Sequence, residues 1–140
     1  MSRHHRDLER MYHRAPCNQA HQPRLEVGDG VATVSMDIAP DMHHAAGAVH
    51  GAFYFKLLDD AAFFAANSLV GDAFVLTASL HVDLLRPVVA GRLRAEGRVI
   101  KAGRTLLFAE SSLFDGEGTL LARGTGTFAR SQIPLERDVE

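Results

Sequence analysis

The stretch "AAGAVHGAFYFKLLDDAAFFAANSLV", residues 45–70, decides the fold that this sequence predicts. From Gly51 to about Leu69 neither proline nor a second glycine interrupts it, and it is rich in alanine, phenylalanine and leucine. It is also longer than an ordinary strand, so the pattern indicates a helix. The helix is apolar almost all the way round, and we therefore expect it to be buried. Two adjacent acids, Asp59 and Asp60, stand in its middle.

The helical spacing separates these two acids. At ~100° per residue, Asp60 shares a face with Lys56 one turn earlier, and we expect an ion pair between them. Asp59 lies among alanine and phenylalanine side chains, where a carboxylate is costly unless a local group satisfies it. Such a site tends to raise a carboxyl pKa and to leave a base ready to act. The structural alternative, in which Asp59 caps a loop or pairs with an arginine of the sheet, stays open.

His50 and Gly51 stand where the helix begins. The first amides of a helix are unpaired and carry positive partial charge, and glycine lets a substrate approach them closely. They could polarise a carbonyl as an oxyanion hole does, or form a plain loop-to-helix junction. His50 and Asp59 are separated by ~13 Å along the axis and point in nearly opposite directions. If both act at one reacting atom, a second subunit supplies one of them, and the site is shared across a homodimer interface.

Neither histidine spacing nor cysteine content predicts a metal site. The spacing of His43, His44 and His50 is not a known ligand pattern, and no nearby carboxylate or cysteine completes it. The single cysteine, Cys17, cannot form an internal disulfide, and its polar, proline-flanked surroundings make it a poor nucleophile. We expect no metal.

The rest of the chain alternates with the period of β-strands. A hairpin is predicted over residues 24–38 with its turn at Gly28-Asp29-Gly30, followed by strands over residues 75–85, 91–101, 104–114 and 118–130. In the strand over 75–85, strict alternation puts Leu76 on the apolar face and Thr77 on the polar face. His81 and Asp83 share that polar face, and we interpret them as an exposed or interface pair. One long helix against one antiparallel sheet is an α+β arrangement.

A length of 140 residues predicts one main domain. Residues 1–14 are charged but carry an apolar stripe that predicts a short helix, formed by Leu8, Met11 and Tyr12. We expect residues 1–22 to be a helix and loop extension, residues 23–131 to form the main domain, and residues 132–140 to be a loose tail.

Composition excludes several classes of protein. With 46% hydrophobic and 23% charged residues and a net charge of −2, the chain is ordinary for a globular protein and shows no basic face that would bind nucleic acid. The N-terminal sequence "MSRHHRDLERMYHR" has no apolar segment of a secretory signal. No uncharged apolar run reaches the ~18 residues of a membrane span. We therefore expect a soluble cytoplasmic protein without nucleic-acid or membrane partners.

The sequence "HGAFYFKLLDDAAFFAANS", residues 50–68, resembles the helix motif of hotdog-fold thioesterases of the phenylacetate-degradation (PaaI-like) type. That motif is His-Gly-Gly, a short apolar run and Leu-x-Asp-x-Ala, and its functional positions fall here on His50, Gly51 and Asp59. The later "LLRPVVAGRLRAEGRVIKAGR", residues 84–104, resembles the family's arginine-proline strand end, glycine and alternating strand. The resemblance covers roughly residues 23–130.

The resemblance implies a hotdog fold, in which an antiparallel sheet wraps one long helix, assembled as a homodimer and further as a tetramer. It implies hydrolysis of an acyl-coenzyme A thioester to free acid and coenzyme A, with Asp59 as general base or nucleophile. The Gly51 amide would polarise the thioester carbonyl across the dimer interface, and His50 would help the thiolate leave. Thr77 falls where many relatives carry Ser or Thr to orient the attacking water. No cofactor is implied besides the coenzyme A of the substrate.

The resemblance also implies substrate-binding positions. Arg86, Lys101 and Arg104 are candidates for the coenzyme's phosphates, although each also suits a plain surface role. An apolar tunnel for the acyl group would be lined by Phe53, Phe55 and their neighbours.

Two positions depart from the family motif. Its second glycine is Ala52 here, and the position six before His50, usually Asn or Gln, is His44. An imidazole could donate a hydrogen bond to the carbonyl, but its reach differs from that of an amide and its charge depends on pH.

Two other functions remain open from the sequence. A hotdog dehydratase would need a proline-containing loop after its histidine, which this sequence lacks. A hotdog module that binds acyl-CoA without turning it over is kept open by His44, although no DNA-binding segment accompanies it. The acyl group and the pathway are not specified by the sequence.

Overall fold

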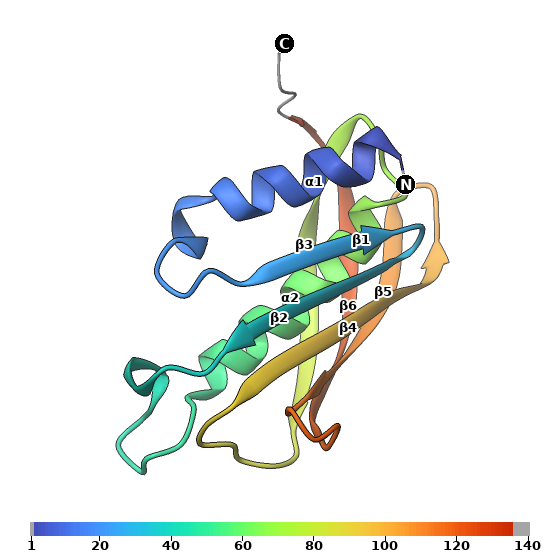
Figure 1. Cartoon of the computed structure of the whole chain (residues 1–140). Coiled ribbons are helices and arrows are strands. Elements are labelled where there is room, and N and C mark those ends of the chain that lie inside the picture. Colours follow the sequence, from blue (N-terminus) through green and yellow to red (C-terminus); the bar gives the residue numbers. More distant parts are fainter. Residues whose placement is uncertain (1, 136–140) are drawn as a thin grey trace.

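The computed structural model describes residues 2–135, in which an antiparallel six-stranded sheet wraps around one long helix (Figure 1). The strands lie in the order β1-β2-β4-β5-β6-β3. The elements are α1 (Arg3–Arg14), η1 (Pro16–Asn18), β1 (Arg24–Gly28), β2 (Val31–Asp37), η2 (Pro40–Met42), α2 (Gly51–Asn67), β3 (Ala73–Leu84), β4 (Arg92–Ala102), β5 (Leu106–Phe114) and β6 (Leu120–Pro134). This is the α+β hotdog arrangement expected from the sequence.

Helix α2 is buried because small and apolar side chains face the sheet. Leu57, Leu58 and Ala61 have no exposed surface. The closest approach is at Gly97 of β4, where a Cβ atom would lie 2.3 Å from the carbonyl oxygen of Ala61. Only glycine fits such an approach of strand to helix. No helix in the described part of the chain is long and apolar enough to cross a membrane.

Ser111 of β5 lies beside Gly97 under the helix, and its hydroxyl is unsatisfied. The residue is 3% exposed, and within residues 2–135 its Oγ has no hydrogen-bond partner. A buried polar group without a partner costs about 1–3 kcal/mol. We expect Ser111→Ala to raise the free energy of unfolding by about 1 kcal/mol in urea denaturation. Ser112→Ala, on the opposite face of the same strand, is the matched control and should change little; a loss of stability in Ser111→Ala would contradict the prediction.

The predicted N-terminal helix and hairpin are confirmed, and the helix covers the edge of the sheet that strand β1 of the hairpin forms. The hairpin turns at Asp29 and Gly30, and α1 buries the predicted stripe against the core. Glu9 Oε2 accepts a hydrogen bond from the backbone N–H of Val27 at 2.8 Å. His13 Nε2 accepts one from the N–H of Leu25 at 3.0 Å. Side chains of α1 therefore satisfy outward-facing amides of β1 that would otherwise bind another strand.

Strand β3 forms the opposite edge and corrects one expectation. A register shift between Thr77 and Ser79, a β-bulge, interrupts its pairing with β6. Before the bulge Thr77 faces α2 and Leu76 is 47% exposed, so the strict alternation predicted for these two residues was wrong. After the bulge Val82 packs against the core, as expected. One extra residue reverses the faces of a strand because side chains alternate with period two.

The last strand is longer than expected. β6 continues to Pro134, which pairs with Ala73, and Leu135 is buried. The predicted loose tail, residues 132–140, therefore begins inside a strand. Residues 136–140 lie outside the described residues.

Candidate active site

Asp59 lies in the middle of α2, in a pocket of about 290 Å³. The hydroxyl of Thr77 donates a hydrogen bond to Asp59 Oδ1 at 2.9 Å. The pocket is lined mainly by apolar side chains from α1, α2 and β3. Its lining residues are Met11, Tyr12, Ala15, Cys17, Asn18, Lys56, Asp59, Asp60, Phe63, Phe64, Phe74 and Thr77.

The surroundings make the Asp59 carboxyl more basic than usual. Burial raises its pKa, and the neighbouring charge of Asp60 raises it further. The hydrogen bond from Thr77 and the charge of Lys56 act in the opposite direction, because both stabilise the carboxylate. The net pKa is raised, as the apolar helix face predicted. Within residues 2–135, Asp59 has neither a loop amide nor an arginine of the sheet as a partner, and its hydrogen-bond donor is Thr77.

Asp60 has the structural role expected for it. Lys56 Nζ lies 2.9 Å from Asp60 Oδ2, which confirms the predicted ion pair. The hydroxyl of Tyr12 donates to the same oxygen at 2.7 Å. Burial and the adjacent Asp60 carboxylate raise the pKa of Tyr12, so this phenol stays protonated. Asp60 is thus neutralised, and Asp59 is the carboxylate left facing the pocket with a hydroxyl as its partner.

Asn67 positions Thr77 over the helix. Its amide nitrogen donates to the carbonyl oxygens of Val70 at 3.1 Å and Ala73 at 3.0 Å. Its amide oxygen accepts from the N–H of Val75 at 2.9 Å. These bonds tie the start of β3 to the end of α2, so that Thr77 is brought back to Asp59.

The start of α2 forms a second pocket of about 360 Å³. His50 caps the helix, and its Nδ1 accepts from the N–H of Ala52 at 2.9 Å. The N–H of Gly51 has no acceptor among the described residues, as expected for the first turn of a helix. The pocket is lined by His44, Ala48, Val49, Gly51, Tyr54, Leu84, Leu85, Arg86 and Pro87.

His44 lies beside His50 in this region. Their ring centroids are 6.4 Å apart, and both residues are exposed. His44 Nδ1 accepts from the N–H of Ala46 at 3.0 Å. A ring nitrogen that accepts a bond from an amide carries no proton, so Nε2 holds the proton in both neutral imidazoles. His43 instead contacts the carbonyl oxygen of Val89 at 2.7 Å, and within residues 2–135 no three His, Cys, Asp or Glu side chains gather as a metal site.

A single chain does not bring the two groups of predicted residues together. Asp59 and Thr77 line the first pocket, while His44 and Gly51 line the second, and the two pockets share no residue. The sequence separation of His50 and Asp59 corresponds to ~13 Å along the helix axis. Each pocket therefore holds only part of the predicted set of catalytic residues.

The three predicted phosphate-binding residues lie at two ends of the sheet. Arg86 lines the second pocket, and its carbonyl oxygen accepts from the hydroxyl of Tyr54 at 2.9 Å. Lys101 and Arg104 are exposed near the turn between β4 and β5, at the end of β4 away from the start of α2 (Figure 1). Their binding role stays a prediction.

Phe53 and Phe55 line neither the Asp59 pocket nor the pocket at the start of α2. Phe53 contacts the ring of His21 edge-on at 5.6 Å, and Phe55 is 45% exposed. Their role in an acyl tunnel stays a prediction. The aromatic residues that line the Asp59 pocket are Tyr12, Phe63, Phe64 and Phe74, and none of them was predicted as a substrate-binding residue. Phe63 lies one turn after Asp59 on the predicted apolar face, so the helical spacing did place it beside that acid.

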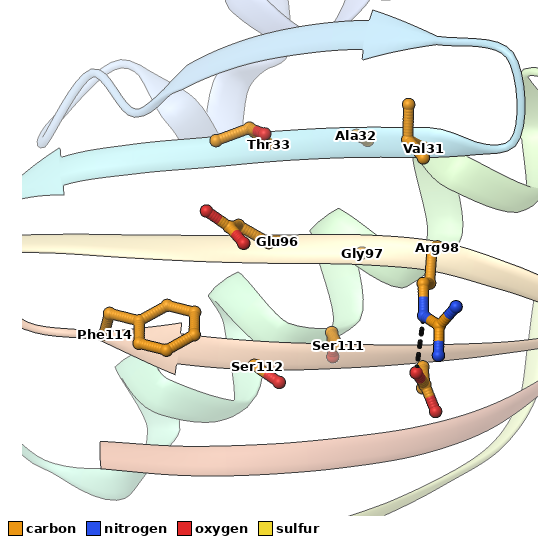
Figure 2. Close-up of a pocket in the computed structure, with 10 residues that line it drawn as sticks. Val31, Ala32, Thr33, Glu96, Gly97, Arg98, Ser111, Ser112 and Phe114 are labelled. Carbon is orange, nitrogen blue, oxygen red and sulfur yellow. Dashed lines mark hydrogen bonds and ion pairs between the residues drawn. The ribbon is translucent and has the colours of Figure 1, made fainter. Parts of the chain in front are cut away.

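A hollow of about 300 Å³ lies across β2, β4 and β5, where the side chains of Glu96 and Arg98 project from the face opposite α2 (Figure 2). Arg98 Nε donates a hydrogen bond to Glu110 Oε2 at 2.7 Å, and Glu96 Oε2 lies 2.7 Å from Arg94 Nη1, so both charges already have partners. None of the predicted catalytic residues lies there. We do not assign a site to this hollow.

Comparison with known proteins agrees with the fold and motif. A conserved protein of Pseudomonas aeruginosa of known structure is 30% identical, with a TM-score of 0.81 over 87% of this chain and 98% of that chain. A mutant of the phenylacetic acid degradation protein PaaI from Thermus thermophilus is 27% identical, with a TM-score of 0.77 over 84% of this chain and 100% of that chain. PaaI of E. coli has the same fold, with a TM-score of 0.84 at 24% identity over 92% of this chain and 94% of that chain.

A relative from Saccharolobus solfataricus is 28% identical over 99 residues, which make up 71% of this chain and 66% of that protein. The sequence model of the thioesterase superfamily matches residues 46–122, which include His50, Gly51, Asp59 and Thr77. The chain therefore belongs to the thioesterase superfamily and is of the PaaI-like hotdog type.

Proposed function

We propose that this protein hydrolyses acyl-CoA thioesters to a free acid and coenzyme A, with Asp59 as the base or nucleophile. The observation that carries the proposal is the raised pKa of Asp59 in an apolar pocket, with the Thr77 hydroxyl as its partner. As a base, the carboxylate takes a proton from water while the water oxygen bonds to the carbonyl carbon. The C–S bond then breaks, and the acid and the thiol leave. As a nucleophile, the carboxylate itself forms a transient anhydride that water hydrolyses.

The start of α2 supplies the electrophilic half of the proposed site. The free N–H of Gly51 points out of the positive end of the helix dipole and would bond the thioester oxygen. His44 Nε2–H would take the place of the amide that relatives carry at this position, since its Nδ1 is engaged by Ala46. His50 holds its proton on Nε2 for the same reason and would give it to the departing thiolate. Arg86 lines this pocket and is the candidate for contact with the coenzyme's phosphates.

The two halves would meet in a dimer formed through β3. This strand pairs with β6 on one side only. Asn67 bonds backbone groups of Ala73 and Val75 at its start, and beyond these residues no strand of the described part of the chain pairs with its other side. A bare strand edge pairs readily with another chain, and two copies of one edge pair by two-fold symmetry. We propose that such a dimer places Asp59 of one subunit near Gly51 of the other, and that dimers associate further into a tetramer.

Release of free thiol tests the function directly. The wild-type protein should release coenzyme A from at least one member of a panel of acetyl-, butyryl-, hexanoyl-, octanoyl- and benzoyl-CoA. The corresponding oxygen esters should react more slowly, since the leaving group is poorer. Saturable binding without thiol release on the whole panel would overturn the hydrolase and replace it with an acyl-CoA-binding module.

The pH profile tests the role of Thr77. Because the base must be ionised, kcat/KM should fall on the acid side where Asp59 titrates, above the ordinary aspartate pKa of ~3.9. The bond from Thr77 lowers the pKa of Asp59, so Thr77→Val should move this acid limb to higher pH. Thr125→Val, an exposed threonine on β6, is the control and should leave the limb in place. An unchanged limb in Thr77→Val would show that Asp59 is not the group that titrates.

A further inference from the structure

One wall of the Asp59 pocket comes from the N-terminal segment. The wall residues come from the end of α1, from its C-cap Ala15 and from η1, and they are Met11, Tyr12, Ala15, Cys17 and Asn18. All of them precede residue 46, where the match to the thioesterase superfamily begins. The catalytic motif and this wall therefore belong to different parts of the chain, and only the motif lies within the superfamily match.

The wall is held in place by buried contacts. Tyr12 is 4% exposed, bonds Asp60 at 2.7 Å and packs edge-on against the ring of Phe64 at 5.2 Å between centroids. Lys56 Nζ lies 5.5 Å from the centroid of the Tyr12 ring. The amide nitrogen of Asn18, a residue only 3% exposed, donates to the carbonyl oxygen of Tyr12 at 2.8 Å. The turn after α1 is therefore fixed against the same helix that carries Asp59.

The chemistry of the pocket selects for an uncharged acyl group. The Asp60 carboxylate is paired with Lys56 and accepts a hydrogen bond from Tyr12. Among the described residues that line the cavity, no unpaired cation is therefore present to bind an anionic acyl chain. The remaining surface is supplied largely by Met11, Ala15 and phenylalanine rings. A volume of about 290 Å³ is at the lower end of the range for ligand pockets, ~300–1,000 Å³. A small apolar acyl group fits this space.

We propose that residues 11–18 set the length of the acyl group, with Met11 and Ala15 as specificity-determining residues. This inference rests on the proposed thioesterase function. Ala15 is partly exposed, with φ −59° and ψ 136°, which any larger residue adopts. Ala15→Phe should therefore fold and fill the pocket from its wall. Met11→Ala should enlarge the pocket at the end of α1.

The test is the ratio of kcat/KM values along a series from acetyl- to octanoyl-CoA. In Ala15→Phe, kcat/KM for the longest acyl group that the wild type accepts should fall about 10–200-fold relative to acetyl-CoA, the range for one misfit group in an apolar pocket. In Met11→Ala the preferred length should shift upward. Ala20→Phe, exposed in the same segment but outside the pocket, is the matched control and should keep the wild-type profile. Succinyl-CoA should be a poorer substrate than butyryl-CoA for the wild type.

The outcomes separate this inference from the function on which it rests. No thiol release by the wild type on any substrate would overturn the hydrolase itself. Wild-type turnover, with both variants scaling all acyl lengths by one common factor, would overturn the role of residues 11–18 and leave the hydrolase standing. Thermal unfolding of both variants shows whether each is folded, and the opposite directions expected for them exclude a general loss of stability as the cause.

Discussion

Asp59→Asn should reduce the rate of thiol release by about 10²–10⁴-fold, the range typical for loss of a general base, and Asp60→Asn should keep most of the activity. The two residues are adjacent on one helix, so they are matched in position and differ in surroundings. Asp59 faces the pocket with a hydroxyl as its partner, whereas Asp60 is engaged by Lys56 and Tyr12. Asparagine at position 60 still accepts the bond from Tyr12. Equal losses in both variants would contradict the assignment of Asp59.

Thermal unfolding of Asp59→Asn would test whether the loss of activity comes from unfolding. The folded state raises the pKa of Asp59, so the folded protein binds this proton more tightly than the unfolded chain does. The resulting stabilisation is fully present below the unfolded pKa and is lost as the pH rises through the folded pKa. At neutral pH the ionised carboxylate therefore destabilises the folded state, and Asp59→Asn should melt at a higher temperature than the wild type. The difference should disappear in acid.

Mixed dimers test whether the site is shared between subunits. Asp59→Asn and His44→Ala should each be poorly active alone. In a heterodimer of the two, one site carries both defects and the other carries neither, so about half of the wild-type activity should return. Differently tagged subunits allow the heterodimer to be isolated. Failure to recover activity in a confirmed heterodimer would place both residues within one chain's site.

Gly97→Ala should destabilise the protein by more than any other substitution proposed for this chain, by about 3–5 kcal/mol. A Cβ atom at position 97 would lie 2.3 Å from the oxygen and 2.4 Å from the carbon of the Ala61 carbonyl. The Ala61 carbonyl belongs to the backbone of the central helix, and Gly97 belongs to a strand in the middle of the sheet. Neither moves without displacing the core, and overpacking of this kind forces backbone shifts.

Urea denaturation measures this effect. Gly116→Ala, at a turn position where an added Cβ atom would have no neighbour within 4 Å, is the control and should change little. Ala61→Gly should not rescue Gly97→Ala, since the clash is with the carbonyl group and not with the alanine methyl. A Gly97→Ala protein within about 1 kcal/mol of the wild type would show that α2 moves freely over the sheet.

Residues close together in the sequence predicted the central helix and the ion pair on it. The length and composition of the stretch around Asp59 indicated the helix, and one turn of spacing indicated the Lys56–Asp60 ion pair. The start of the helix at Gly51 followed from the motif that begins there. These features need only residues that are near each other in the chain.

Features that join distant segments could not be predicted in the same way. Tyr12 and Asp60 are 48 residues apart, and nothing in either segment specifies the bond between them. The bulge after Thr77 allows its hydroxyl to face Asp59. It could not be predicted, because the sequence around it alternates as in a regular strand. The extension of β6 to Pro134 depends on pairing with Ala73, not on the polar composition of the tail.

The coverage of β1 by α1 determines how many copies can join one sheet. Glu9 and His13 occupy the donors through which β1 would recruit another strand, so within residues 2–135 the edge left for pairing is that of β3. When two such chains join at their open ends, both ends of the combined sheet are closed. Growth stops at that size because no template remains for a third chain, whereas a sheet open at both edges could add copies without limit and form fibres. In the proposed dimer, helix α1 would therefore block extension of the sheet at the β1 edge.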